Sequence, residues 1–538
     1  MSIILSIFLG IVIKIKEACY NINAETRNYM KQKQIQQIGI LFTLCLIISF
    51  LFLMICSKAS FLYPLNEWMD ANCFFTIGRG MLHGKVYYVD LFDQKGPLLY
   101  FYHTIAALIS ETTFIGVFLI EVISFAFFLY YAYQLLHLYL KRELAFFALP
   151  IISFLILTLP AFSHGDSAEE FCLPFLMYSL YSLVKYLRKN QTFPSRSMLL
   201  INGIMAGCVM TIKFSMLGFW FAFMMCLFFI IITKKAYKVA MISCLIFLFG
   251  MSLPLIPWIL YFMYHGALNT FFESYIYFNI HYYPVHSPFL LKMIMVIAKP
   301  IRFLGQNPGI GIPVIIGFTT LLFDQTILKK RSHKIIILIT FLFLCLGVFS
   351  GGVSFRYYYL ILTPFLVLGL ISLGSWMQAY YPRLLCKNAD ALFIIITTLL
   401  LCVTFYGSKN TQMINGRVKR EDLVQYRFAK IIKQTKNPTL LNYQFLDGGF
   451  YLASNILPSN RYFQKLNIPD EVYPDNIEDQ NEMIRHKKVD FIVTRTIINR
   501  YTNDTKSKYL KRNYKEVSRM NQEYEEKRYR YILWQKKP

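Results

Sequence analysis

Three acids and a lysine lie within one short stretch near the front of the chain: Asp70, Asp90, Asp93 and Lys95. A carboxylate partly removed from water can have its pKa raised toward neutrality and can then accept a proton from a hydroxyl group. A lysine close behind can hold a phosphate as a point charge. An ordinary hydrated loop is the alternative for any one of these residues. We expect the group together to serve hydroxyl and phosphate chemistry, because charge is expensive in a chain otherwise built for lipid.

The rest of the chain is built largely for lipid. Of 538 residues, 56% are hydrophobic, and the mean hydropathy is +0.44. Apolar runs of about 20 residues, the length that crosses a bilayer, recur throughout. This composition excludes a soluble globule and predicts a mainly α, polytopic membrane protein with about eleven transmembrane helices and additional outer juxtamembrane helices. The expected spans lie near 38–57, 114–138, 144–161, 171–187, 198–212, 214–233, 239–262, 308–325, 335–349, 356–374 and 391–406.

Basic clusters beside these runs predict the orientation. The net charge is +25, and much of it lies in short clusters such as Lys234–Lys238 and Lys329–Lys334, which read as cytoplasmic topology signals facing anionic lipid. We therefore expect membrane lipids and no nucleic acid as partners. With a cytoplasmic N-terminus, all strong basic loops fall on one side if segment 97–110 lies along the outer face without crossing. The opening run 1–13 is expected to be interfacial.

The same alternation places the remaining polar stretches on the outer face. Further candidate substrate-binding residues there come with plainer alternatives: helix capping for the acids at 169–170, snorkelling for the lysine at 213, and an aromatic belt around 357–359. Aromatic residues at 275–282 could stack on a sugar, although aromatics are common at interfaces. These candidates are His164, Asp166, Glu169, Glu170, Lys213, Asn279, Tyr282, Arg356 and Tyr359.

The composition changes abruptly near residue 407. Strand-like runs at 439–443, 489–494 and 528–535 alternate with a helix-compatible stretch at 475–488, which predicts a small α/β domain. The expected organisation is a basic cytoplasmic segment 1–37, a transmembrane domain 38–406 whose first outer loop is 58–113, and an extracytoplasmic domain 407–538. The 11 cysteines form no CxxC pair or Cys/His ligand spacing, so neither a disulfide framework nor a zinc site is expected. A divalent metal at the outer acids stays open.

The first outer loop resembles that of the membrane-embedded glycosyltransferases of the GT-C fold. The resemblance is closest to the bacterial branch with the rhizobial lipopolysaccharide-core transferases; aminoarabinose transferases and protein O-mannosyltransferases are more distant. Many relatives have Asp-Glu and Lys-Pro-Pro at two points where this chain differs. The tail stretch 446–463 is similar to the outer domain of Gram-positive members. The loop motif runs Asp70…Gly80…Gly84-x-x-Tyr87…Asp90-Leu-Phe-Asp93-x-Lys95-Gly96-Pro97-Leu98, with Asp70-Ala71 and Lys95-Gly96-Pro97 as the departures.

The resemblance implies an inverting hexosyl or pentosyl transfer from a polyprenyl-phosphate-linked sugar on the outer face of a bacterial cytoplasmic membrane. The acceptor would be a cell-envelope polysaccharide, a teichoic acid or a lipid-linked glycan. Asp70 would be the catalytic base and Lys95 would hold the lipid phosphate. Two other hypotheses are a transporter or flippase of lipid-linked oligosaccharide, which predicts ionisable residues at mid-membrane and repeat symmetry, and a non-catalytic polymer-binding scaffold.

Overall fold

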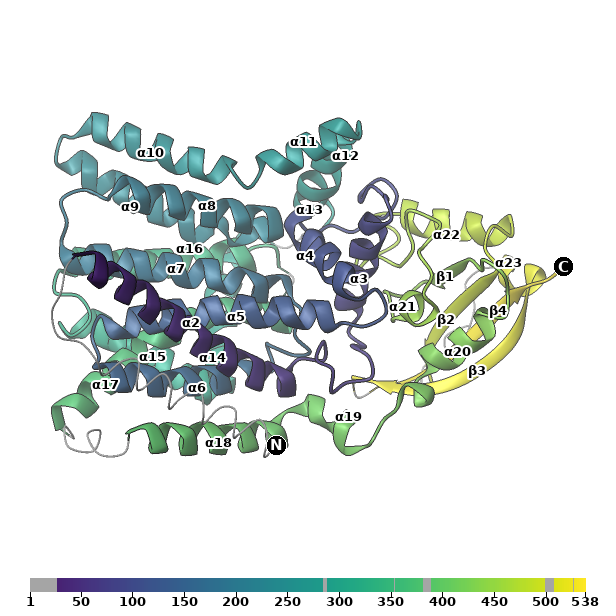
Figure 1. The fold of residues 1–538 in the computed structure, drawn as a ribbon. Helices are drawn as coiled ribbons and strands as arrows, with labels where there is room; N and C mark the ends of the chain where they lie inside the picture. The colour runs from purple at the N-terminus through teal and green to yellow at the C-terminus, as the bar shows by residue number, and fades with distance from the viewer. Residues whose placement is uncertain (1–26, 284–287, 353, 381–388, 499–507, 526) are drawn as a thin grey trace.

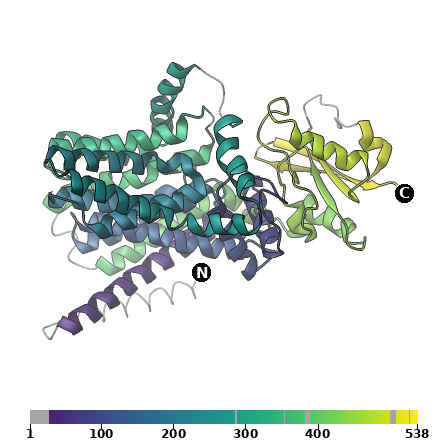
Figure 2. The ribbon, with the colours of Figure 1, turned by 90° about the horizontal axis from the view of Figure 1, so that it is seen from above.

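The structure, a computed structural model, describes residues 27–538 except 284–287, 353, 381–388, 499–507 and 526. The expected interfacial run 1–13 and most of the basic segment 1–37 lie outside the described residues. A bundle of long helices forms one part of the molecule, and a small sheet with short helices stands at one end of it (Figure 1). Figure 2 shows the same two parts from above. The chain is therefore mainly helical with a small C-terminal sheet, as predicted.

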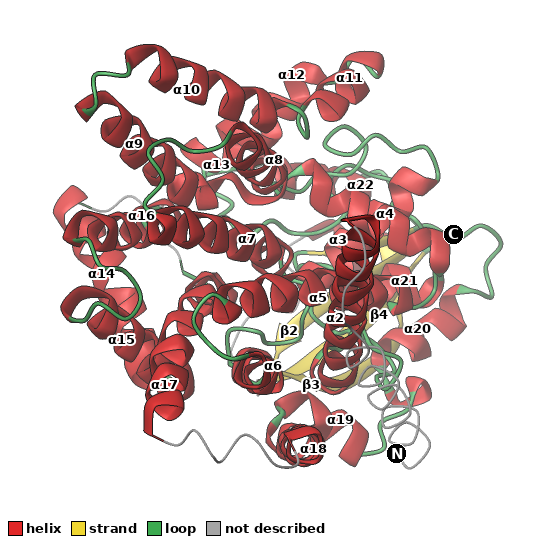
Figure 3. Ribbon diagram, turned by 60° about the vertical axis from the view of Figure 1, so that its left-hand side comes forward, coloured by secondary structure: helices red, strands yellow, loops and turns green. Residues whose placement is uncertain are grey.

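The apolar runs form the helices of the bundle. In lipid every backbone N–H and C=O must be paired within the segment, which a helix achieves. Each predicted span overlaps one of these helices. Within the bundle α2 packs on α5, α5 on α7, α7 on α8 and α8 on α10. Figure 3 shows the bundle from an oblique direction. The bundle helices are α2 (Arg27–Cys56), α5 (Ile115–His137), α6 (Arg142–Leu157), α7 (Ala168–Lys189), α8 (Arg196–Lys213), α9 (Gly218–Thr233), α10 (Tyr237–Ser252), α11 (Ile256–Tyr264), α14 (Phe289–Gln306), α15 (Pro308–Phe323), α16 (Arg331–Phe349), α17 (Leu366–Tyr380) and α18 (Ala389–Gly407).

Six helical runs in the described residues are long and apolar enough to cross a membrane, or seven if α10 and α11, bent by 45°, form one broken span. One of the six, Arg196–Thr233, turns back on itself. The backbone of Lys213 is extended, with φ −153° and ψ 90°, and Lys234 at the far end donates a hydrogen bond of 2.8 Å to the carbonyl of Thr192. The predicted hairpin at Lys213 is therefore present. The total of about eleven spans stays a prediction.

Two short helices, α3 (Met69–Leu82) and α4 (Pro97–Ile109), lie between the bundle and the sheet (Figure 1). They pack closely because Gly78 has no side chain: a Cβ there would lie 2.5 Å from the His103 carbonyl carbon. Pro97 starts α4 at a position where its missing N–H costs nothing. Asp70 stands in the first turn of α3, and the loop that joins the two helices carries Asp90, Asp93 and Lys95.

The C-terminal part is built on a four-stranded sheet of order β1-β2-β4-β3. Strands β1 and β2 are parallel, with Leu440 opposite Phe491, and β4 is antiparallel to both β2 and β3. Three of the strands coincide with the predicted runs, and the predicted helix at 475–488 is α22. The elements are β1 (Leu440–Tyr443), β2 (Phe491–Ile497), β3 (Tyr514–Tyr524), β4 (Lys527–Lys536), α20 (Val424–Ile432), α21 (Phe450–Ser454), α22 (Asp475–Arg485) and α23 (Lys508–Asn513).

Buried polar contacts join helix α3 to this C-terminal part. The Thr76 hydroxyl donates to Asp447 Oδ2 at 2.6 Å, and Arg79 donates to Asn455 Oδ1 at 2.8 Å. Arg79 is 2% exposed and Asp447 is fully buried. Since a buried charge that loses its partner is costly, these contacts hold α3 in a fixed place against the sheet.

Candidate functional site

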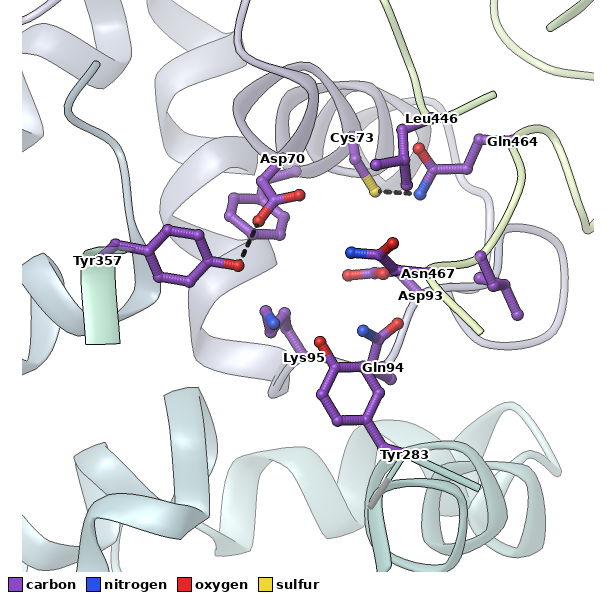
Figure 4. Close-up of a pocket in the computed structure, with 12 residues that line it drawn as sticks. Asp70, Cys73, Asp93, Gln94, Lys95, Tyr283, Tyr357, Leu446, Gln464 and Asn467 are labelled. Carbon is purple, nitrogen blue, oxygen red and sulfur yellow. Dashed lines mark hydrogen bonds between the residues drawn. The ribbon is translucent and has the colours of Figure 1, made fainter. Parts of the chain in front are cut away.

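A pocket lies where α3, the loop after it and the C-terminal part meet (Figure 4). Its cavity volume is about 20 Å³, which suffices for a water molecule and not for a sugar ring. A larger ligand therefore requires the lining side chains to move. The lining residues are Asp70, Cys73, Phe74, Asp93, Gln94, Lys95, Tyr283, Tyr357, Leu446, Gln464, Leu466 and Asn467.

Asp70 stands in the first turn of α3 with its carboxylate at the pocket. The Tyr357 hydroxyl donates a hydrogen bond of 3.0 Å to Asp70 Oδ2. Burial raises the pKa of the Asp70 carboxyl to about 6; the charge of Asp93 also raises it, whereas Lys95 and the hydrogen bond from Tyr357 lower it. The carboxyl therefore changes protonation close to neutral pH, as a general base should.

Asp93 and Lys95 face the same pocket from the loop before α4 (Figure 4). The Tyr100 hydroxyl donates to Asp93 Oδ2 at 2.6 Å and accepts from the backbone N–H of Lys95 at 3.0 Å, so one phenol fixes both residues. Asn279 donates to the Gln94 carbonyl at 2.7 Å. Within the described residues the Lys95 ammonium itself has no hydrogen bond or ion pair, which leaves it free for an anion.

The C-terminal part supplies the opposite wall of this pocket. Gln464 accepts from the Asp447 backbone N–H at 2.8 Å and donates to Cys73 Sγ at 2.8 Å. Asn467 is exposed, with its amide beside the pocket (Figure 4). Sequence reasoning missed these side chains, together with Cys73 and Tyr283. The resemblance at 446–463 was the one signal that pointed to this region.

Lys213 lies at the tip of its hairpin and pairs with an acid at the start of α7. Its ammonium forms an ion pair with Glu169 Oε1 and lies 3.4 Å from the centre of the Tyr358 ring. Glu169 is fully buried, and its other oxygen has no hydrogen-bond partner among the described residues. The same ammonium lies 5.9 Å from the centre of the Tyr357 ring, so this ion pair adjoins the tyrosine that holds Asp70.

The other predicted acids of this region belong to a separate buried cluster. Asp166 Oδ1 lies 2.9 Å from His103 Nε2, and the Asp166 backbone N–H donates to Glu121 Oε1 at 2.8 Å. Gly165, with φ +83°, is needed there because a Cβ would lie 2.5 Å from the same glutamate oxygen. Both carboxylate oxygens of Glu170 are buried without a hydrogen-bond partner among the described residues. These residues do not line the pocket.

The remaining candidates lie around the pocket and not in it. Asp90 closes its own loop by accepting from the Val86 N–H at 2.7 Å. His164 is buried and stacks between Trp68 and Tyr524, and Tyr359 stacks on Phe303 with ring centres 4.3 Å apart. Tyr282 packs against Phe278 and Tyr473, and Arg356 is exposed. Tyr283, which follows Tyr282, and Tyr357, which follows Arg356, line the pocket instead of these two candidates.

The part of the chain that the structure describes does not offer a metal site of three side chains. No group of three or more His, Cys, Asp or Glu residues there is arranged to hold a metal ion. Asp70 and Asp93 are the acids at the pocket, and Lys95 stands beside them. We therefore derive no step through a metal.

The helical bundle with its small C-terminal sheet is a membrane-protein fold that a solved structure shares. The crystal structure of ArnT from Cupriavidus metallidurans bound to undecaprenyl phosphate is similar over 92% of this chain and 97% of that chain, with a TM-score of 0.56 and 12% sequence identity. The chain belongs to the family described as "Putative competence-induced protein Ccs4 N-terminal domain", which matches residues 25–406. Among curated proteins none matches the sequence. The GT-C-like fold that the sequence predicted is thus confirmed; the rhizobial or Gram-positive branch stays a prediction.

Proposed function

We propose that this protein is a glycosyltransferase that moves a sugar from a polyprenyl-phosphate donor to an acceptor on the outer face of a bacterial cytoplasmic membrane. The acceptor is a cell-envelope glycan, a teichoic acid or a lipid-linked glycan. The observation that carries the proposal is that Asp70 and Lys95 both line one pocket at the end of the helical bundle. One is a base poised near neutral pH and the other is an unpaired cation.

The proposed reaction is a single inverting displacement. A hydroxyl oxygen of the acceptor attacks the anomeric carbon of the sugar while the bond from that carbon to the phosphate oxygen breaks. Asp70 takes the hydroxyl proton, and the polyprenyl phosphate leaves with the negative charge. Lys95 stabilises that charge as it develops, in a setting where water is scarce and a fixed cation counts for more than in water.

Other candidates have supporting roles in this scheme. Asp93, which has one oxygen held by Tyr100, would orient a sugar hydroxyl with the other. Lys213 is the second cation for the phosphate, although Glu169 now neutralises it, so a phosphate has to compete for it. Arg356 is a third cation, reachable because it is exposed. Glu170 is buried in the first turn of α7, so it can bind a sugar hydroxyl only if that turn moves away from the residues that cover it.

The fold comparison supports the donor class. ArnT, in the structure that this chain resembles, is bound to undecaprenyl phosphate, and a lipid phosphate is the leaving group that a free lysine at a membrane edge suits. A transporter or flippase is the alternative. Glu121 is a buried acid on a long apolar helix, as that alternative requires, but it contacts Ser57 and Asp166, which follow the ends of α2 and α6. It therefore lies toward the end of the bundle and not at mid-membrane.

A transfer assay tests the proposal. We expect purified protein to release polyprenyl phosphate from a synthetic polyprenyl-phosphate sugar when acceptor is present, and Asp70→Asn to lower the rate by roughly 10²–10⁴-fold, the usual contribution of a general base. Asp90→Asn is the matched control: it makes the same chemical change in the same loop and keeps an acceptor oxygen for Val86. Full activity of Asp70→Asn, or transport without release, contradicts the proposal. Envelope glycans compared by mass with and without the gene would identify the acceptor.

A further inference from the structure

A second pocket lies on the other side of the segment that leads into α3. It has a cavity volume of about 130 Å³, several times what one water molecule needs. Three separate regions form it: the loop between α2 and α3, the turn between α4 and α5, and residues of the C-terminal part. It shares no lining residue with the first pocket. The lining residues are Lys58, Ala59, Ser60, Phe61, Tyr63, Pro64, Leu65, Asn66, Thr112, Thr113, Phe114, Ile115, Arg420, Tyr426 and Leu452.

The lining of this second pocket favours an anion. Its charged residues are Lys58 and Arg420, and among the described residues it contains no Asp or Glu. Lys58 is already paired with Glu67 at 2.6 Å. Arg420 donates through Nε to the Pro64 carbonyl at 3.3 Å and lies over the Tyr426 ring, but within the described residues it pairs with no acid. Its terminal nitrogens are therefore available as a fork for phosphate or carboxylate oxygens.

A buried amide in the wall of the second pocket also lacks a partner. Asn66 is fully buried, and its Nδ2 has no hydrogen-bond partner among the described residues. Its Oδ1 accepts from the Trp68 N–H at 3.1 Å, so the amide is oriented and the unpaired end is the donor. An unsatisfied buried donor destabilises the folded state, and a ligand with acceptor oxygens would remove that cost.

The rim of the second pocket reaches an exposed apolar surface of the bundle. Phe61 is 57% exposed, and its ring contacts Phe50 of α2 and Phe118 of α5. Beside it on α5, Leu119 and Ile123 are also exposed. An apolar chain lying along α2 and α5 would therefore begin where the polar pocket ends.

We propose that this pocket binds the phosphate-bearing headgroup of an anionic membrane lipid, with the acyl chains along α2 and α5. Arg420 contacts the phosphate oxygens, Asn66 donates to a further oxygen, and Phe61 lies against the first acyl carbons. The site does not depend on the transferase proposal, because it uses none of the residues of the first pocket. It does adjoin α3: Asn72 donates to the Asn66 carbonyl at 2.8 Å, so a bound lipid would steady the segment just before Asp70.

Lipid retention by the full chain tests this proposal. The protein is purified in discs of phosphatidylcholine with a minor share of phosphatidylglycerol, and retained lipid is measured by native mass spectrometry. We expect phosphatidylglycerol to be retained, and Arg420→Gln to weaken its retention about tenfold, the value of roughly one charge-assisted hydrogen bond. Asn66→Asp keeps the contact to Trp68 and replaces the donor by a negative charge; it should weaken retention at least as much.

Matched variants separate this site from its alternatives. Arg417→Gln removes the same charge three residues away, outside the pocket, and Lys95→Gln removes the cation of the first pocket; both should retain the lipid like the unaltered protein. The proposal is overturned if Arg420→Gln and Asn66→Asp both retain phosphatidylglycerol as well as the unaltered protein does. Loss with Lys95→Gln instead would assign the lipid to the first pocket. Displacement of phosphatidylglycerol by inorganic phosphate alone would show a site for soluble anions and would also overturn it.

Discussion

At the scale of single residues, one tyrosine adjusts the proposed base. Tyr357 comes from the apolar run that follows α16, far from α3 in sequence, and its hydroxyl bonds Asp70 at 3.0 Å. A hydrogen bond to the charged carboxylate favours that form and so lowers its pKa. Together with Lys95, this contact keeps the pKa of buried Asp70 at about 6. The carboxyl can therefore act as a base at neutral pH in spite of its burial.

Tyr357→Phe should move the pH profile. The base must be deprotonated, so the rate falls as the pH drops through the pKa of Asp70, near 6. Removing the hydroxyl raises this pKa, and the acid limb of kcat/KM should shift to higher pH by about one pH unit, comparable to one hydrogen bond to a charged group. Tyr359→Phe, which removes a hydroxyl from a ring stacked on Phe303, should leave the profile unchanged. An unshifted profile for Tyr357→Phe contradicts this role.

Residue types and spacing identified only part of the pocket. Asp70, Asp93 and Lys95 were predicted together because they share one loop, and charge is costly beside a membrane. Gln464 and Asn467 could not be assigned to the same pocket, because nearly the whole bundle lies between them and that loop in sequence. In the sequence alone their amide side chains carry no sign of a functional site; the fold places them in the same pocket as Asp70.

At the scale of elements, α3 is held from the C-terminal side by a buried carboxylate. Asp447 accepts hydrogen bonds from the Thr76 hydroxyl at 2.6 Å, the Gly449 N–H at 3.0 Å and Asn442 at 3.2 Å. Burial nevertheless raises the pKa of Asp447 to about 6. The folded state thus binds this proton more tightly than the unfolded chain does. The carboxylate costs stability above pH 6, and the cost is relieved as the pH falls toward 4.

Thr76→Val should loosen this contact. The change preserves shape but removes the hydroxyl that Asp447 accepts from, and a buried acceptor without its donor costs about 1–3 kcal/mol. We expect a lower thermal unfolding midpoint for the purified protein, with a larger loss at pH 8 than at pH 5, because the carboxylate form needs the donor most. Thr192→Val, the same change at an exposed site outside both pockets, should have little effect. If the thermal unfolding midpoint of Thr76→Val is as high as that of the control variant, the contact does not contribute to stability.

Helices were easier to predict than the sheet. An apolar run long enough to span the bilayer has to pair its backbone N–H and C=O groups within the segment, which a helix does. Each predicted span therefore contains a helix. Strand β3 was missed because its side chains are polar on both faces: only its end residues, Tyr514 and Tyr524, are buried. An edge strand of this kind lacks the continuous buried run that marks β1, β2 and β4. Its place is decided by pairing with β4, which the local sequence does not encode.

At the scale of the whole molecule, the pocket and the C-terminal part lie at one end of the bundle, and the basic loops lie elsewhere. The positive-inside rule predicts that the loop at 329–334 faces the cytoplasm and the pocket faces outward. A cysteine introduced at exposed Asn467 should react with an impermeant maleimide in intact cells. One introduced at exposed Lys330 should react only after the membrane is opened. The reverse pattern would place the pocket on the cytoplasmic side.

The first pocket also sets an order of assembly. One wall comes from the loop beside α3, made early in synthesis, and the other from residues 446–467, made only after the last bundle helix. A nascent chain that has already inserted all its helices therefore still lacks one wall of the pocket, which is completed only when the C-terminal part folds against Thr76. Under the proposed function, a polypeptide stopped at Tyr406 would be an inserted bundle without transfer activity.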